Sequence, residues 1–133
     1  MQGKPRWIST TRVIKINREV VAETGEPYHL RDRGLLESAC ARPANHWAYG
    51  GKDDIITLAT ALLFGIARNH PFEQGNKRTG FLAASLFLRF NGYKLSSDEE
   101  HTEVFGKAIE DVIEDRMTEE DFIERIRPFV VPD

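Results

Sequence analysis

Cysteine is nearly absent from this sequence, and so are several features that would indicate particular classes of protein. Cys40 is the single cysteine among 133 residues, so neither a disulfide framework nor a cysteine-rich metal site is available. No apolar run is long enough to cross a bilayer, and the residues that follow Met1 lack the apolar segment of a secretory signal peptide. We therefore expect a cytoplasmic protein without membrane association.

Basic charge is not in excess either. The chain carries 18 Lys and Arg residues against 21 Asp and Glu, a formal net charge of −3. Nucleic-acid binding needs a broad basic face, so we expect no direct nucleic-acid partner, although a local basic pocket is compatible with this balance. With 41% hydrophobic and 29% charged residues, the composition is that of a globular chain and not of a disordered or membrane-embedded one.

Helical periodicity dominates the chain, and strand signals are nearly missing. We expect one all-α domain over residues 1–133, a bundle of about six helices. Polar residues set the expected starts of these helices: Ser9 or Thr10, Asp32, Asp53 or Asp54, Ser97 in a capping box, and Thr118. Glycines and prolines, among them Pro43 for the second helix, set the expected ends. The predicted helices cover about residues 10–24, 33–42, 54–69, 76–90, 97–115 and 118–127, with a brief extended segment at 93–95.

The stretch that organises the chain is residues 70–80, with the sequence HPFEQGNKRTG. It places a histidine, a Gly-Asn turn and two cations directly before residues 81–90, which are apolar on nearly every face and predict a helix buried all round. Lys77 and Arg78 thus lie at a helix N-terminus, which is already positive. Phosphate is the anion that such a position favours, held by the planar fork of Arg and the point charge of Lys.

His70 is the candidate base of this stretch. Its ordinary pKa of about 6.5 suits it to accept a proton near neutral pH. A histidine that only anchors a loop, and a Lys-Arg pair that is only solvated surface, are the alternatives for these residues taken singly. Together they predict an anion site with a base beside it.

The stretch resembles the signature of the Fic/Doc family. His70-Pro71-Phe72, Gly75-Asn76 and Arg78 match the family pattern, and Lys77, where most Fic proteins have glycine, indicates the Doc (death-on-curing) branch. Similarity extends over about residues 28–95, including 31–39, 41–43, 49–50 and 65–69. The resemblance implies the helical Fic/Doc fold, with the motif loop at the N-terminus of the central helix and Phe72 anchoring that loop in the core.

The resemblance also implies an activity. Doc-like proteins transfer the γ-phosphate of ATP to a protein hydroxyl, a threonine of elongation factor Tu, and so stop translation. His70 would be the general base, and Gly75, Asn76, Lys77 and Arg78 would hold the phosphates, with the two cations also neutralising charge during transfer. Such toxins are paired with an antitoxin protein, which would be a separate chain here because no inhibitory helix is recognisable.

One motif position departs from the family. Gln74 stands where the family has the carboxylate that binds Mg²⁺. Mg²⁺ prefers charged oxygen ligands, so an amide here predicts weakened metal binding. The segment 44–52, with Trp47 and Tyr49, is expected to be a loop and is the candidate for the flap that holds the target polypeptide in Fic-like proteins. Packing of both aromatics onto the core is the alternative.

Two other functions stay open at this point. One is transfer of AMP, as in Fic proteins with glycine in the motif; Lys77 favours phosphate transfer instead. The other is a catalytically weak module that binds a partner protein, which Gln74 favours.

Overall fold

The computed structural model describes residues 3–51, 54–96 and 99–133, and the side chains of all of these except 99–102. Over these residues the chain forms six α-helices, one short 3-10 helix and a two-stranded sheet, which confirms the all-α prediction. The elements are α1 (Thr10–Thr24), α2 (Arg33–Tyr49), α3 (Ile55–Asn69), α4 (Asn76–Phe90), β1 (Tyr93–Leu95), α5 (Glu99–Ile113), α6 (Glu119–Ile126), η1 (Arg127–Phe129) and β2 (Val130–Pro132).

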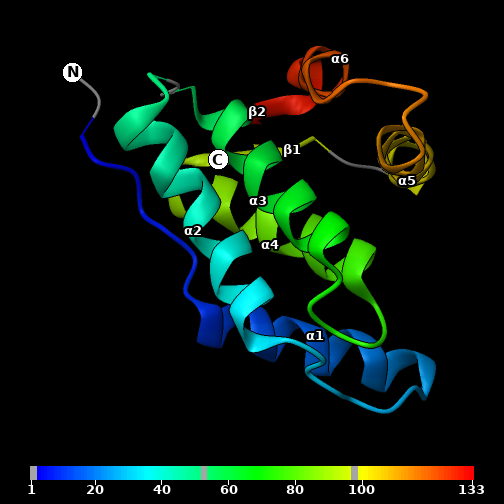
Figure 1. The fold of residues 1–133 in the computed structure, drawn as a ribbon. Coiled ribbons are helices and arrows are strands. Elements are labelled where there is room, and N and C mark those ends of the chain that lie inside the picture. The colour runs from blue at the N-terminus through cyan, green and yellow to red at the C-terminus, as the bar shows by residue number, and fades with distance from the viewer. Residues whose placement is uncertain (1–2, 52–53, 97–98) are drawn as a thin grey trace.

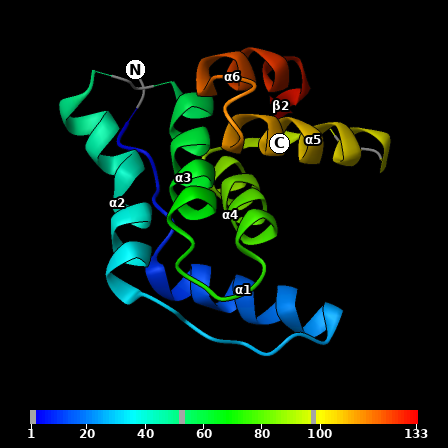
Figure 2. The ribbon, with the colours of Figure 1, turned by 45° about the vertical axis from the view of Figure 1, so that its right-hand side comes forward.

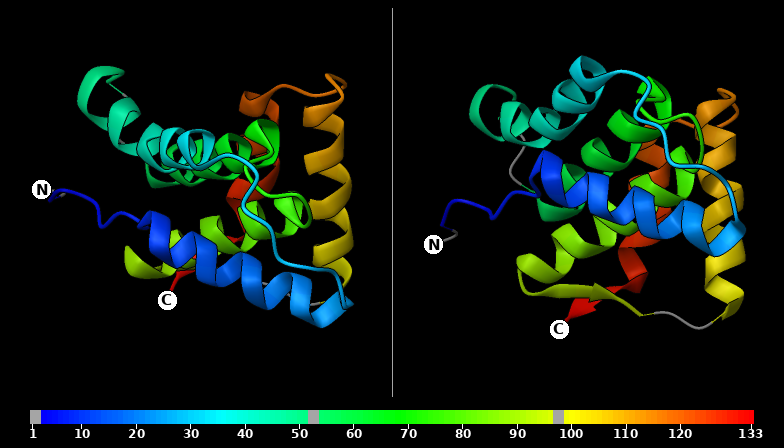
Figure 3. Two further views of the ribbon diagram at one scale, coloured as in Figure 1. Left: turned by 60° about the horizontal axis from the view of Figure 1, so that its bottom comes forward. Right: turned by 90° about the horizontal axis from the view of Figure 1, so that it is seen from below.

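Helix α3 is the centre of the bundle (Figure 1). Helices α2 and α4 flank it, and both pack extensively against it. Helix α1 runs across one end of these helices, and α5 and α6 lie on the side away from α2 (Figure 2). Seen from below, α1 lies in front of the turn between α3 and α4 (Figure 3).

Four of the predicted helix caps are present. The side chains of Ser9, Asp32, Asp54 and Thr118 each accept a hydrogen bond from a backbone N–H in the first turn of α1, α2, α3 and α6. Such bonds satisfy donors that have no partner within the helix. The capping box predicted at Ser97 lies outside the described residues.

Helix α4 is not buried all round, so that prediction was wrong, and the most buried helix is α3. Residues 58–67 of α3 are all buried, whereas Leu82 and Phe90 of α4 are exposed. The remaining face of α4 does pack closely. A Cβ at Gly80 would lie 2.8 Å from the carbonyl oxygen of Leu63, so glycine permits this approach of α4 to α3.

Helix α2 continues through Pro43, which the sequence predicted to end it. A proline removes one helical hydrogen bond, at about 3 kcal/mol or more in a helix interior. Tertiary contacts offset this loss. Pro43 is itself buried, and Trp47, one turn later, packs at 6.1 Å between ring centroids against Trp7. Residues 44–49 are therefore helix rather than loop.

The C-terminal part adds two details. The extended segment 93–95 is confirmed as β1, and its antiparallel partner is β2, which the sequence did not predict. Helix α5 presents Phe105, Ala108, Ile109 and Val112 to the core, whereas Val104 is exposed. No helix among the described residues combines the length and apolar character needed to cross a membrane.

Candidate functional site

The motif of residues 70–80 lies at one end of the bundle, where the chain turns from α3 into α4 next to α1 (Figure 2). Phe72 anchors this turn. Its side chain is 1% exposed, and its ring centroid lies 6.2 Å from that of Tyr28. The prediction that Phe72 fixes the loop in the core is confirmed. The buried ring of Phe72 therefore fixes the position of both the candidate base, His70, and the candidate anion-binding turn.

His70 has a left-handed backbone conformation, with φ 50° and ψ 53°, at the C-terminal cap of α3. For a residue with a Cβ this conformation costs roughly 1–2 kcal/mol. It persists because the neighbouring groups are held: the N–H of His70 donates to the carbonyl oxygen of Ile66, 3.3 Å away, and the carbonyl of His70 accepts from Arg31. The chain turns here and leaves the imidazole exposed.

Asn76 closes the motif loop through its side chain. Its Oδ1 accepts from the N–H of Phe72 at 3.0 Å, and its Nδ2 donates to the carbonyl oxygen of Phe72 at 2.8 Å. Asn76 is 5% exposed, so these bonds satisfy a buried peptide group. The predicted contact with phosphate would therefore fall to the backbone N–H of Asn76, because its amide is already engaged.

The same amide bears on the tautomer of His70. Nδ2 of Asn76 lies 3.3 Å from Nδ1 of His70. Because Phe72 fixes which end of the amide is NH₂, Nδ2 presents a hydrogen, and Nδ1 of the neutral ring is the acceptor. In that neutral tautomer the ring hydrogen is on Nε2. Accepting a proton at Nε2 requires the other tautomer, in which the contact with Asn76 is given up.

An extended segment just before α2 runs antiparallel to the motif. Leu30 and Phe72 form the bridge, and the hydrogen bonds come from the residues on either side. The backbone N–H of Arg31 donates to the carbonyl oxygen of Pro71 at 2.8 Å, and that of Glu73 donates to His29 at 3.0 Å. This pairing explains why the resemblance begins near residue 28: the segment supports the motif loop.

Asn17 of α1 is a contributor that the sequence analysis missed. Its side chain is fully buried. Nδ2 lies 2.9 Å from the carbonyl oxygen of Gln74 and 3.0 Å from Oγ1 of Thr79. A polar residue within the apolar stripe of the first helix was the available signal, because a buried amide needs partners from another part of the fold.

The first turn of α4 has the features of an anion site. Gly75 occupies the cap position with φ 76°, and no side chain among the described residues caps this turn. The backbone N–H groups of residues 76–78 precede the first hydrogen bond within the helix, in which Thr79 donates to Gly75. Such N–H groups and the positive end of the helix dipole together favour phosphate.

The two motif cations flank this turn and are paired with carboxylates. Nζ of Lys77 lies 3.4 Å from Oε1 of Glu110 on α5, and Nη2 of Arg78 lies 2.8 Å from Oε2 of Glu23 on α1. All four side chains are about half exposed or more, and exposed ion pairs contribute only about 0–1 kcal/mol. A polyphosphate can therefore displace these carboxylates at little cost.

A groove of about 710 Å³ opens between α4 and α5 beside these cations. Lys77, Arg78 and Glu110 line one part of it, and Phe81, Leu82 and Ile109 supply an apolar part. The groove has the size of a small-molecule site. It is the cavity that joins an apolar surface to the anion-binding turn.

The metal position has no carboxylate. Gln74 supplies only a neutral amide, its backbone carbonyl is bonded to Asn17, and the described residues hold no cluster of three or more His, Cys, Asp or Glu side chains that could bind a metal. Mg²⁺ is commonly held by one or two carboxylates together with substrate phosphates, so at this site the phosphates would have to supply most of the charged ligands. The residues present fit an ion held mainly by a nucleotide.

Trp47 and Tyr49 do not form a flap over the motif. They lie on the last turn of α2, whose first turn is the end beside the motif, and a helix of 17 residues is about 25 Å long. Figure 2 shows the two ends of α2 at opposite ends of the bundle. Trp47 packs on the core and Tyr49 is 88% exposed. The structure places both residues away from the motif, because residues 44–49 are helix and not the expected loop.

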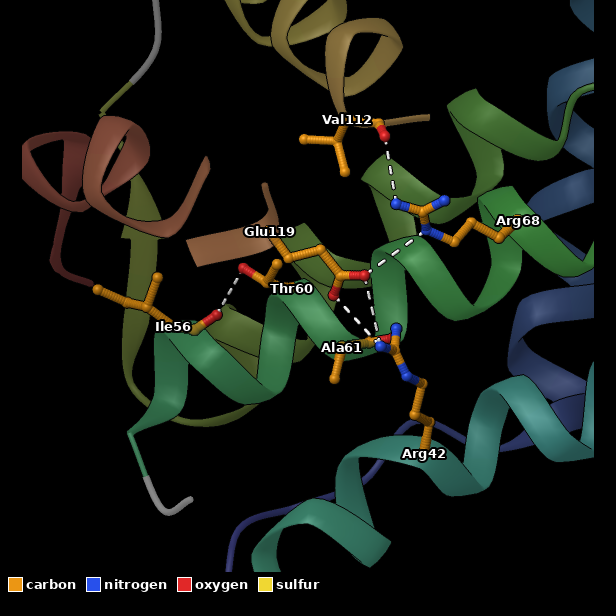
Figure 4. A network of polar contacts seen from close by, with 7 residues as sticks. All are labelled: Arg42, Ile56, Thr60, Ala61, Arg68, Val112 and Glu119. Atoms are coloured by element: carbon orange, nitrogen blue, oxygen red, sulfur yellow. Dashed lines mark hydrogen bonds and ion pairs between the residues drawn. The ribbon is translucent and has the colours of Figure 1, made fainter. Parts of the chain in front are cut away.

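A second polar cavity, of about 590 Å³, lies among α2, α3 and α6. Figure 4 shows Glu119 placed between Arg42 and Arg68, at 3.2 Å and 3.6 Å. Arg42 also donates to the carbonyl oxygen of Ala61, and Arg68 to that of Val112. None of the described residues that line this cavity belongs to the motif. The network ties four helices together, namely α2, α3, α5 and α6.

A sequence model of the Fic/DOC family matches residues 7–88, which include the motif, its supporting segment and most of α4. This chain is a member of the Fic/Doc family. It is 43% identical over 75 residues to a protein named Toxin Doc from Mycolicibacterium smegmatis, a match that covers 56% of this chain and 58% of that protein. It is 30% identical over 95 residues to Protein kinase doc of Escherichia phage P1, covering 71% of this chain and 75% of that protein.

Proposed function

We propose that this Fic/Doc protein is a toxin that transfers the γ-phosphate of ATP to a hydroxyl of a protein target, elongation factor Tu, in the cytoplasm. An antitoxin protein would restrain it. The observation that carries the proposal is the placement of His70 beside the uncapped first turn of α4, with Lys77 and Arg78 at the same turn. The names of the two relatives, a toxin and a protein kinase, support it.

In this mechanism the triphosphate lies on the N–H groups of residues 76–78, with the rest of the nucleotide in the groove between α4 and α5. The oxygen of the target hydroxyl attacks the γ-phosphorus, the bond to the bridging oxygen of ADP breaks, and His70 accepts the hydroxyl proton. Lys77 and Arg78 neutralise the charge that develops. Bound magnesium would add positive charge on the phosphates.

The segment that lies beside the base is residues 28–32, which pair with the motif. A target polypeptide held next to His70 would therefore contact this segment. His29, Arg31 and Asp32 are exposed in this segment. This replaces the role that the sequence analysis gave to Trp47 and Tyr49.

A second candidate function is a binding module with weak or no catalysis. The absence of a carboxylate at Gln74 favours it, because charge on the ligand strengthens magnesium binding. Two variants distinguish this candidate from a catalytic one. Gln74→Asp introduces the carboxylate of the family pattern, and Gln74→Asn introduces a side chain of the same size as Asp without the charge.

The experiment uses elongation factor Tu, magnesium and ATP labelled on either the α- or the γ-phosphate. We expect label on the target from the γ position alone, and none with His70→Ala. Gln74→Asp should lower the magnesium concentration for half-maximal rate about tenfold or more, equivalent to about 1.4 kcal/mol, while Gln74→Asn should not. Transfer of α label would establish AMP transfer instead. Silence of both the wild type and Gln74→Asp would favour the binding module.

A further inference from the structure

The backbone of His70 is held in place from both of its sides by one residue. Nε and Nη2 of Arg31 donate to the carbonyl oxygen of His70 at 2.9 Å and 2.5 Å, and Nη2 also reaches that of Asn69 at 3.2 Å. The backbone N–H of Arg31 donates to the carbonyl oxygen of Pro71 at 2.8 Å. Arg31 thus bonds the peptide groups that precede and follow the His70–Pro71 linkage.

This arrangement has a physical reason at the end of α3. The last carbonyl groups of a helix have no partner within it and carry the negative end of the helix dipole. A guanidinium bonded to the carbonyls of Asn69 and His70 satisfies them and complements that charge. It also stabilises the left-handed conformation of His70, which non-glycine residues rarely adopt.

We propose that Arg31 is the positioning residue of the catalytic base in this protein. It orients the backbone of His70 so that the imidazole lies against Asn76, the first residue of the anion-binding turn of α4. The proposal rests on the function proposed above, because it assigns a role in that same reaction. The Arg31 side chain is exposed, and it donates to the carbonyl oxygens of Asn69 and His70.

A matched control lies two residues further along. Arg33 is also exposed, and its recorded partner is Glu37, one turn away on α2, at 3.8 Å. Removing either guanidinium takes the same charge from the same segment. A difference between the two variants therefore reports the bonds to the His70 carbonyl, not the loss of a surface charge.

The test compares Arg31→Ala, Arg31→Lys and Arg33→Ala in the γ-phosphate assay. We expect Arg31→Ala to lower kcat about 10- to 100-fold, the scale expected for a misplaced catalytic group, with KM for ATP changed less than about threefold. Arg31→Lys should recover part of the rate, since an ammonium can donate to the same carbonyl. Arg33→Ala should keep the wild-type rate. Equal kcat for Arg31→Ala and Arg33→Ala would overturn the proposal.

Backbone NMR separates this proposal from the function on which it rests. The carbonyl ¹³C shift of His70 and the side-chain amide signals of Asn76 should move in Arg31→Ala and stay in Arg33→Ala, while thermal unfolding confirms that both variants fold. These chemical shifts can be measured even if the wild type transfers no phosphate. Absence of transfer would contradict the proposed function but not the positioning of His70 by Arg31. Unchanged shifts in a folded Arg31→Ala would overturn the positioning role.

Discussion

Two asparagines of this chain make nearly the same bonds in different surroundings, and they allow a sharp prediction. The Asn76 amide bonds the N–H and the C=O of Phe72, in a buried position. The Asn91 amide bonds the N–H and the C=O of Arg6 at 2.9 Å and 3.0 Å, and also the carbonyl of Phe87, in a partly exposed position. Asn76→Ala therefore removes these bonds from a buried site, and Asn91→Ala removes similar bonds from a site that water can reach.

The magnitudes follow from what replaces the lost bonds. In Asn76→Ala the buried N–H and C=O of Phe72 lose their partner, at about 1–3 kcal/mol for each unsatisfied group. We expect a total loss of about 2–4 kcal/mol in the free energy of unfolding. In Asn91→Ala water reaches the groups of Arg6, so the loss should be about 0.5–1.5 kcal/mol, the net value of ordinary hydrogen bonds.

Urea denaturation followed by far-UV circular dichroism measures both values, and an unchanged m-value confirms that the comparison is valid. Asn76→Ala should also abolish transfer of γ-phosphate, since the motif loop that carries the anion-binding turn loses the bonds that close it on Phe72, while Asn91→Ala should retain it. A loss of stability in Asn76→Ala equal to or smaller than that in Asn91→Ala would refute the view that the buried amide holds the motif loop together.

Two further predictions concern the ends of helices. Gly75→Ala should lower the free energy of unfolding by more than about 2 kcal/mol, because the new residue would have a positive φ and a Cβ 3.0 Å from Val20. Gly92 also has a positive φ, 88°, but a Cβ there would meet open space. Gly92→Ala should therefore lower the free energy of unfolding by only about 1 kcal/mol in the same urea titration. Burial acts to raise the pKa of the Asp54 carboxyl, but hydrogen bonds from Thr57 and Arg127 outweigh it, so this pKa is lowered. Asp54 therefore adds stability that is present above its unfolded pKa of about 3.9 and is lost as the pH falls through the lower folded value. Asp54→Asn should have a lower Tm than the wild type at pH 7 and an equal one near pH 2, and a pH-independent difference would contradict this.

Local signals predicted much of the fold. The caps at Ser9, Asp32 and Thr118 are side chains that bond the backbone three residues away, so their effect is contained in a few consecutive positions. The end of α2 could not be predicted in this way. Pro43 is a local signal to stop, and only the packing of Pro43 and Trp47 within the bundle overrides it.

Some residues of the candidate site could be identified from local sequence, and others only from the tertiary structure. His70, Gly75 and the two cations were visible as a motif because they are close in sequence and have a chemistry that suits phosphate. Arg31 and Asn17 were not assigned a role, since they are 39 and 57 residues away from the groups that they bond. Nothing in their local sequence shows which carbonyl oxygens they meet.

The sequence by itself determined the helical class, the place where α3 turns into α4 and the charge around that turn, because each depends on residues that are neighbours along the chain. The tertiary structure alone decided that α3 is the buried centre, that Tyr49 lies far from the motif and that Asn76 closes the loop on Phe72. It also decided that Glu23 and Glu110 pair with the motif cations. These features depend on which distant elements pack together, and packing sums weak contributions from the whole chain.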